Sequence, residues 1–239
     1  MPCGAPYGRD GTLQAMRFAG SASWRFAEGI EQAPVVALFV RDTLGLEVPA
    51  ESVIPPRLDG DLPDYSALVA AEQRSAAGAA WTGWWQEVVA QDVRRQQGPP
   101  ASVDQRVWLR QWATEHRAAF DPPEFASLAD RPALAKAVQV TLNGALRWAD
   151  ARRRALLIPP QGQPGQFDYD VVRAAAEQIA RRHGVSPDAL RACAVVLPVD
   201  GIWWNRFAPG AVLCSVHTAR DPGIARSMLT EAFESGLAN

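Results

Sequence analysis

The sequence predicts a helix-rich α+β fold, and three observations lead to that prediction. Apolar residues in the middle of the chain recur with a helical period, the C-terminal part contains short runs typical of β-strands, and 239 residues can bury a sizeable core. We expect a central helical region, at about 66–155, to pack beside a small antiparallel sheet. An N-terminal hairpin and a C-terminal three-stranded meander would form that sheet. One domain over 1–239 is the simplest division, with 1–65, 66–158 and 167–239 as possible sub-units.

The N-terminal part combines candidate strands, one helix and a connector. Apolar residues alternate over 12–27 around a Gly-Ser-Ala turn, which predicts a β-hairpin, although 12–18 also fits a helix. Residues 33–44 follow a helical pattern, with proline in the first turn and glycine just after the end. The stretch 47–64 is rich in proline and reads as an extended connector. Because two strands alone are marginally stable, we expect the hairpin to join the C-terminal sheet.

Three helices are predicted in the middle of the chain. The first starts after Ser66, ends at Gly98 and can break near Gly78. Its apolar stripe falls at i, i+3, i+4, i+7 and i+8, on Trp81, Trp84, Trp85, Val88 and Val89. We expect these tryptophans in the core. The second helix begins with a capping box at Ser102 and Gln105, and the third follows an Asp-Arg-Pro start and ends in three arginines.

The C-terminal part changes from a helical to a strand period. A proline- and glycine-rich linker at 159–166 precedes a helix that Asp168 or Asp170 caps and that ends at Gly184. Three β-rich runs follow, at 193–199, 202–207 and 211–218. An Asp-Gly pair separates the first two runs and a Pro-Gly pair the next two, and both pairs are typical of tight turns. We therefore expect an antiparallel meander, followed by a terminal helix that begins at Asp221.

Composition and charge argue against several classes of protein. The formal net charge is −2, so the strong basic excess of a nucleic-acid-binding domain is missing. No apolar run approaches the roughly 20 residues that cross a bilayer, no secretory signal is visible, and three cysteines do not fit a disulfide framework. We expect a cytoplasmic protein with neither a membrane nor a nucleic-acid partner. The abundant alanine and arginine are typical of a GC-rich, actinobacterium-like genome.

The candidates for catalysis lie in the predicted meander. Ser215 and His217 are two residues apart, so on a strand they point to the same face, as a nucleophile and its base would. Asp200 and Arg206 complete this set of candidate site residues. The sharp turn that presents the nucleophile in many serine hydrolases is missing around Ser215. The alternative is a half-exposed strand histidine that makes ordinary hydrogen bonds.

A metal site is the second chemical possibility in this region. Cys193, Cys214 and His217 come within reach of one another if the first and third runs of the meander are neighbours. Structural zinc usually takes four ligands in two closely spaced pairs, and the second pair is missing here. Buried free cysteines are also common core residues. We therefore predict no metal and no cofactor.

The candidate binding residues are Trp203, Trp204, Asn205 and Arg206. On a regular strand the two tryptophans point to opposite faces, so we expect one in the core and the other exposed. An exposed tryptophan beside arginine is typical of interaction hot spots and of stacking sites for bases or sugars. Burial of both rings beneath helices is the alternative.

No nucleotide-binding or catalytic motif appears in the chain. We therefore predict a non-enzymatic interaction or accessory protein, such as an adaptor, an immunity-type factor or a component of a larger bacterial assembly. Its partner would be another protein or a second copy of itself. The alternative is an enzyme or small-ligand-binding protein with its site on the meander around His217.

Overall fold

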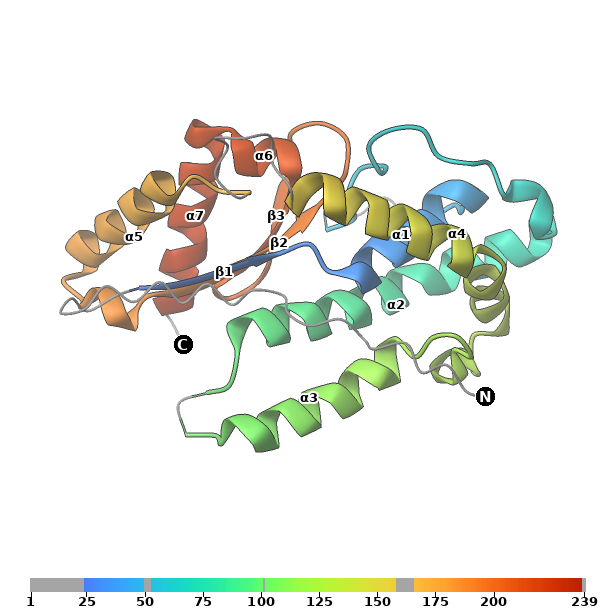
Figure 1. The fold of residues 1–239 in the computed structure, drawn as a ribbon, viewed down its shortest axis with the longest axis horizontal. Coiled ribbons are helices and arrows are strands. Elements are labelled where there is room, and N and C mark those ends of the chain that lie inside the picture. Colours follow the sequence, from blue (N-terminus) through green and yellow to red (C-terminus); the bar gives the residue numbers. More distant parts are fainter. Residues whose placement is uncertain (1–23, 50–52, 101, 158–165, 238–239) are drawn as a thin grey trace.

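A mixed four-stranded sheet lies between two groups of helices (Figure 1). The computed structural model describes residues 24–49, 53–100, 102–157 and 166–237. The strands are β1 (Arg25–Gly29), β2 (Arg191–Leu197), β3 (Trp204–Ala208) and β4 (Ala211–Ser215). Their order is β1-β2-β4-β3, in which β1, β2 and β4 are parallel and β3 is antiparallel to β4. The predicted helix-rich α+β fold is confirmed.

The strand order differs from the predicted meander. Strand β4 lies between β2 and β3, so the Asp-Gly pair at 200–201 does not close a hairpin. The last six residues of β2 are all buried, which suits a central strand with a neighbour on each side. Strand β3 is mostly half-buried and takes the outer position. The second predicted turn is correct, because Gly210, with a φ of 70°, lies in the hairpin between β3 and β4.

Most of the predicted N-terminal hairpin lies outside the described residues. Its last part belongs to β1, which pairs in parallel with β2 from Arg25 opposite Arg191 to Gly29 opposite Val195. The expectation that an N-terminal strand joins the C-terminal sheet is therefore confirmed for β1. The sheet is mixed rather than antiparallel. The long helical connection between β1 and β2 allows their parallel pairing, which needs such a crossover.

The helices mostly follow the predicted pattern. In the described chain the α-helices are α1 (Gln32–Leu44), α2 (Ala71–Gln97), α3 (Gln105–Ala119), α4 (Pro132–Leu157), α5 (Tyr169–His183), α6 (Val216–Arg220) and α7 (Pro222–Leu237). The 3₁₀ helices are η1 (Ser66–Leu68), η2 (Ala126–Leu128) and η3 (Pro187–Ala189). None of the described helices has both the length and the apolar character that crossing a bilayer requires.

Two helix starts differ from the prediction. Ser66 begins η1 rather than α2, and α2 runs through Gly78 without a break. A side chain at Gly78 would collide with the backbone carbonyl of Glu47, so the glycine allows a close approach of the two segments. Asp104, rather than Ser102, caps α3, because its side chain accepts two backbone N–H groups of the first turn.

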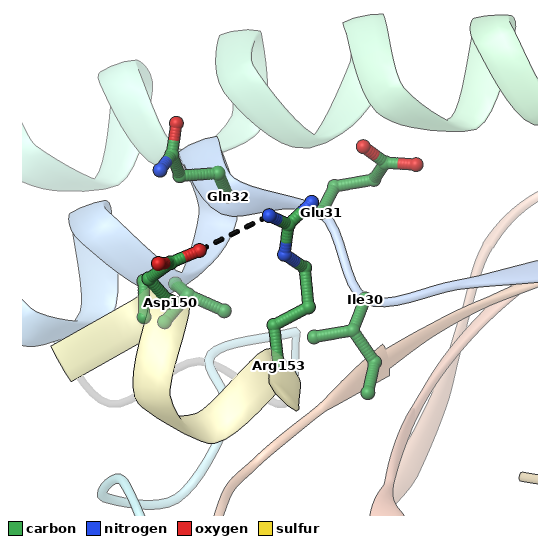
Figure 2. A pocket seen from close by; sticks show the side chains of 7 residues that line it. Ile30, Glu31, Gln32, Asp150 and Arg153 are labelled. Carbon is green, nitrogen blue, oxygen red and sulfur yellow. Dashed lines mark hydrogen bonds and ion pairs between the residues drawn. The ribbon is translucent and has the colours of Figure 1, made fainter. Parts of the chain in front are cut away.

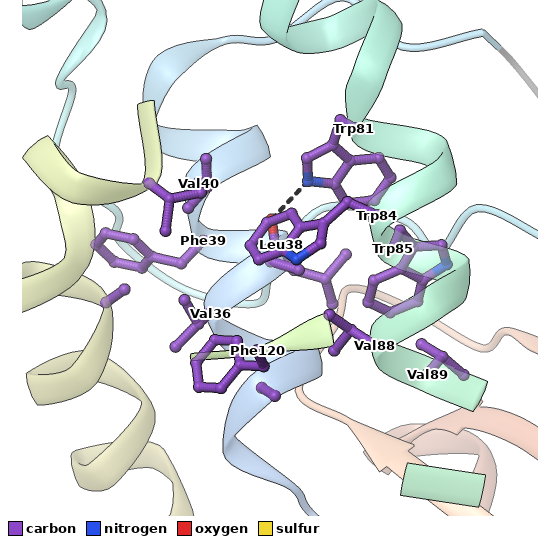
Figure 3. Packing of buried hydrophobic residues seen from close by; sticks show 14 of the residues in the cluster. Val36, Leu38, Phe39, Val40, Trp81, Trp84, Trp85, Val88, Val89 and Phe120 are labelled. Carbon is purple, nitrogen blue, oxygen red and sulfur yellow. Dashed lines mark hydrogen bonds between the residues drawn. The ribbon is translucent and has the colours of Figure 1, made fainter. Parts of the chain in front are cut away.

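Each face of the sheet carries its own hydrophobic core. Helices α1, α2 and α4 build the core on one face, which we call the α2-side core. Helices α5, α6 and α7 build the core on the other face, the α7-side core. Trp81, Trp84 and Trp85 of α2 are fully buried against α1, as their spacing predicted (Figure 3). The indole N–H of Trp81 donates to the Ala37 carbonyl at 2.8 Å, and that of Trp84 donates to the Ala119 carbonyl at 2.9 Å. These two rings are therefore buried without losing a hydrogen bond.

A buried ion pair at the end of α1 ties the proline-rich connector to the sheet. The Arg41 Nε atom lies 2.7 Å from the Asp42 Oδ1 atom, and Arg41 also donates to the carbonyls of Pro55 and Pro56. Asp42 accepts the backbone N–H of Leu58 at 2.7 Å. Pairing and hydrogen bonding offset the cost of burying both charges. The connector is thereby held beside the carboxyl end of β2, where Leu58 forms an isolated antiparallel bridge.

Candidate functional site

The predicted binding residues lie at the start of β3, the outer strand next to β4. Trp203 precedes the strand, and Trp204, Asn205 and Arg206 are its first three residues. Trp203 packs partly against the α2-side core and Trp204 partly against the α7-side core, so the two rings occupy opposite faces, as predicted. Both tryptophans are half-buried. The expectation of one core and one exposed tryptophan is therefore wrong, because each face of β3 is covered only in part.

Hydrogen bonds from the residues after β4 fix the start of β3. The backbone N–H of Ser215 donates to the Trp203 carbonyl at 2.8 Å, and the Trp203 N–H lies 3.0 Å from the Thr218 Oγ1 atom. The Ser215 hydroxyl also caps α6 by accepting the Thr218 N–H at 3.0 Å. Because Trp203 is hydrogen-bonded to Ser215, the alternation of bonded pairs along β3 is fixed, and with it which residues of β3 turn their backbone N–H and C=O groups toward β4.

The outer edge of β3 presents backbone groups to the surroundings. Antiparallel residue pairs alternate between pairs that exchange hydrogen bonds and pairs that do not. Since Trp203 is bonded to Ser215, Asn205 is the next residue bonded to β4, and Trp204 and Arg206 direct their N–H and C=O groups outward. Within the described part of the chain, β4 is the only strand that pairs with β3. Such an edge is a template for a further strand.

The helices leave β3 accessible. Helix α2 packs on β1 and β2, and α7 packs on β2 and β4, whereas β3 packs mainly on β4. Ile202, just before the strand, is 60% exposed. The exposed Arg206 side chain lies 3.5 Å from the Glu231 carboxylate of α7, and a β-bulge after Arg206 interrupts the regular pairing. The regular open edge is therefore short and is flanked by half-exposed tryptophans.

The predicted catalytic residues do not converge on one site. The strand expected over 211–218 ends at Ser215, which caps α6, so His217 lies on a helix instead of beside Ser215 on a strand face. The buried Ser215 hydroxyl donates to Thr218 Oγ1 at 3.0 Å, and no described hydrogen bond joins it to His217. Arg206 lies on β3, and Asp200 follows the carboxyl end of β2. The cap explains the difference, because it starts a helix where the apolar pattern alone predicts a continuing strand.

His217 instead faces Asp59 of the connector. The His217 Nε2 atom lies 3.9 Å from the Asp59 Oδ2 atom, and both side chains are about half exposed. A hollow of about 220 Å³ lies next to this pair, lined by Arg57, Leu58, Gly60, Asp61, Leu62 and Asp200. It lies at the carboxyl end of the parallel strands, where open α/β sheets commonly bind ligands. No local spacing relates Asp59 to His217, so the sequence carried no signal for this pair.

A second cavity lies between the start of α1 and the end of α4 (Figure 2). Its volume is about 10 Å³, which corresponds to a single water position. Figure 2 shows the Arg153 side chain extending across it toward Glu31, and Arg153 pairs with Asp150 at 3.0 Å. This cavity is too small for a substrate.

The cysteines do not form the metal site that was considered. Cys193 belongs to the α2-side core and Cys214 to the α7-side core, so the sheet separates the two thiols. Burial raises the pKa of Cys193 to about 12 and also raises the pKa of Cys214, which disfavours the thiolate form that binds metals. The described residues contain no group of three metal-binding side chains. The first and third runs are neighbours, but Cys193, Cys214 and His217 do not come together in the metal site that was considered.

Two buried acidic residues were not anticipated. Burial raises the pKa of Glu28 on β1 to about 7, although hydrogen bonds from the backbone at 166–167 act in the opposite direction. Asp92 on α2 is 2% exposed, and its Oδ2 atom has no hydrogen-bond partner among the described residues. Burial and the charge of Glu31 raise the pKa of Asp92 well above its usual range. The position of Asp92 on the apolar stripe of α2 is the one signal that could have indicated its burial.

Known proteins provide no further guide to this site. A scan against protein-family models, a search of curated proteins and a search of solved structures each returned no match. The function has to be inferred from the geometry of the chain itself.

Proposed function

We propose that this is a non-enzymatic interaction protein, such as an adaptor, an immunity-type factor or a component of a larger bacterial assembly. It binds a protein partner at the outer edge of β3. The observation that carries the proposal is the outward direction of the backbone N–H and C=O groups of Trp204 and Arg206, beside the exposed Ile202. A partner strand added at such an edge gains affinity from main-chain hydrogen bonds and specificity from side chains.

The side chains around this edge support the same proposal. Trp203 and Trp204 flank the edge on opposite faces, and each keeps part of its ring accessible. Tryptophan and arginine are the residue types that most often dominate the binding energy of protein interfaces. The proposal includes a cytoplasmic location, with which the two free thiols of Cys193 and Cys214 are compatible.

Site-specific photo-crosslinking in cells that express the protein tests the proposal. A photoreactive phenylalanine at position 202 should form adducts with a partner, whereas the same residue at Leu109, exposed on α3, serves as the control. Arg206→Pro removes an outward N–H group and should abolish the adducts, because the added strand loses a hydrogen bond and meets the proline ring. Arg206→Ala keeps that N–H group and should retain adducts. Adducts that persist in Arg206→Pro, or that form equally at 109, would contradict the proposal.

The second proposed function is small-ligand binding at the carboxyl end of the sheet. The observation that favours it is the His217–Asp59 pair, which lies next to a hollow that Arg57, Asp61 and Asp200 line. Such a site suits a polar ligand that both donates and accepts hydrogen bonds, because its walls carry groups of both charges.

A thermal-shift screen with small nucleotides and organic acids tests this second function. A ligand should raise the unfolding temperature of the native protein and of His183→Gln, but not that of His217→Gln. His183 is the matched control, because it also pairs with a carboxylate, that of Glu234, and is also partly exposed. A screen without any shift, or a shift that survives His217→Gln, contradicts ligand binding at this hollow.

A further inference from the structure

We propose that the occupant of the β3 edge is a second copy of this chain, so that two sheets join through antiparallel β3 strands into one eight-stranded sheet. This inference rests on the proposed function and names the partner. Three features of the edge support a second copy. They are the register of its outward backbone groups, the pair of side chains that this register brings together, and the accessibility of both faces of the strand.

The backbone register is the first of these features. Trp204 and Arg206 direct their N–H and C=O groups outward, and they are two residues apart. A two-fold axis beside Asn205 places Trp204 of each copy opposite Arg206 of the other. The backbone N–H and C=O groups of both residues in such a pair point toward the partner strand, so each pair exchanges two hydrogen bonds. The junction therefore has four backbone hydrogen bonds, and symmetry makes its two halves identical.

The side chains of this register also match. Trp204 packs against the α7-side core, and Arg206 pairs with Glu231 of α7, so both side chains lie on the same face of the sheet. Directly opposed residues in an antiparallel pair project to the same face. The register thus brings the guanidinium of Arg206 in one copy next to the indole of Trp204 in the other, twice per dimer. An arginine over a tryptophan ring is the favoured form of cation–π contact.

The accessibility of the strand faces is the third feature. Trp203 and Trp204 are half-buried on opposite faces of β3, because the helices pack mainly on the inner strands. A single added peptide strand would cover the edge and leave most of both faces open. A second copy would bring its own β3, with a second Trp203 and a second Trp204 on the same two faces of the joined sheet. The bulge after Arg206 interrupts regular pairing at one end, which limits the junction to the residues around Asn205.

Sedimentation velocity of the purified protein is the first part of the test. Over a range of about 1 to about 100 µM we expect a mass that rises toward about 52 kDa, twice the 25.9 kDa of the chain. Arg206→Pro should remain monomeric over that range. Arg206→Ala, which keeps the outward N–H group but lacks the cation, should dimerise at least about threefold more weakly. Circular dichroism of both variants verifies that they fold.

A disulfide across the two-fold axis tests the register without relying on a disruptive variant. Asn205 would face Asn205 of the second copy in a non-hydrogen-bonded pair, where the Cα atoms are about 4.5 Å apart, and a disulfide can bridge that distance. Asn205→Cys in a Cys3→Ser background should therefore form a covalent dimer under mild oxidation. Ile202→Cys is the matched control, because the same register separates its two copies by roughly 20 Å. Cys193 and Cys214 are buried and can remain.

The outcomes separate this inference from the proposed function on which it rests. A dimer that crosslinks through Asn205→Cys and not through Ile202→Cys supports pairing of two β3 strands. A dimer without the crosslink at 205 overturns the β3 register, and a monomer at all concentrations overturns the second copy as occupant. In the monomer case, adducts at position 202 to a different protein that disappear in Arg206→Pro would still support strand addition. The absence of such adducts would overturn the proposed function as well.

Discussion

The two outer strands of the sheet, β1 and β3, both carry aromatic residues, but the chain covers them differently. On β1, Phe26 lies 5.3 Å from Phe167 in an edge-to-face arrangement, and the neighbouring Trp24 lies 5.7 Å from Tyr169, measured between ring centroids. The start of α5 and the segment before it supply these partners. Among the described residues, no aromatic ring contact involves Trp203 or Trp204. Both outer strands are half-buried, but among the described residues only β1 has aromatic partners, because the chain returns to it at the start of α5.

The largest expected difference between the two strands is in side-chain truncation. Phe26→Ala should lower the free energy of unfolding by about 3 kcal/mol, because it removes a ring packed between Phe167 and Phe233. Trp204→Ala should lower it by only about 1 kcal/mol, although tryptophan is larger, because no aromatic ring of the described residues packs against it on β3. Urea denaturation followed by circular dichroism at low protein concentration measures both values. Equal losses in the two variants would mean that the aromatic partners of Phe26 do not make β1 better packed than β3.

The buried carboxyl group of β1 gives the second largest expected effect. Glu28 has a folded-state pKa of about 7, above its ordinary value of 4.5, so the folded protein holds this proton more tightly than the unfolded chain does. The stabilising effect of that proton is fully present below pH 4.5 and is lost as the pH rises through 7. We expect the free energy of unfolding to fall by about 2 to 3 kcal/mol between pH 5 and pH 8 on account of Glu28.

The variant Glu28→Gln should flatten that dependence, because glutamine does not ionise. Urea denaturation at several pH values checks this outcome. A substitution on the other outer strand, Asn205→Gln, is the control and should leave the slope unchanged. An unaltered slope in Glu28→Gln would show that burial does not perturb this carboxyl group.

The smallest of these expected effects is at the residue that anchors β3 to the end of β4. Ser215→Ala should lower the free energy of unfolding by about 1 kcal/mol, because it removes the cap of α6. It should also speed amide hydrogen exchange at Trp203, whose N–H lies 3.3 Å from the Ser215 hydroxyl. Ser227→Ala, on the exposed side of α7, should change neither quantity. Unchanged exchange at Trp203 in Ser215→Ala would show that Thr218 and the pairing with β4 hold the start of β3 without the Ser215 hydroxyl.

Local patterns in the sequence predicted most of the helices. The tryptophan spacing of α2 identified its buried stripe, and Gly45 and Gly184 ended α1 and α5 in the left-handed conformation that glycine favours. The positions of β2, β3 and β4 were also recognisable within a few residues. These features depend on residues within one or two turns of each other, so no tertiary information was needed to find them.

The candidate site was predictable only in part. The segment 203–206 was identified from its residue types, but its position on an outer strand was not. The Asp-Gly pair at 200–201 favoured a local hairpin, whereas burial of β2 on both faces required β4 as its neighbour. His217 was placed on a strand because the apolar run continues to 216, and the Ser215 cap overrides that pattern.

The sequence by itself determined most of the helix and strand segments, because periodicity and capping act over a few residues. It also determined that Trp203 and Trp204 lie on opposite faces, since that follows from the two-residue period of a strand. Only the tertiary structure decided the strand order, the pairing of His217 with Asp59 and the burial of Glu28. Each of these depends on contacts between residues that are far apart in the chain. Such contacts form only when the two cores pack on the faces of the sheet, so no local pattern can predict them.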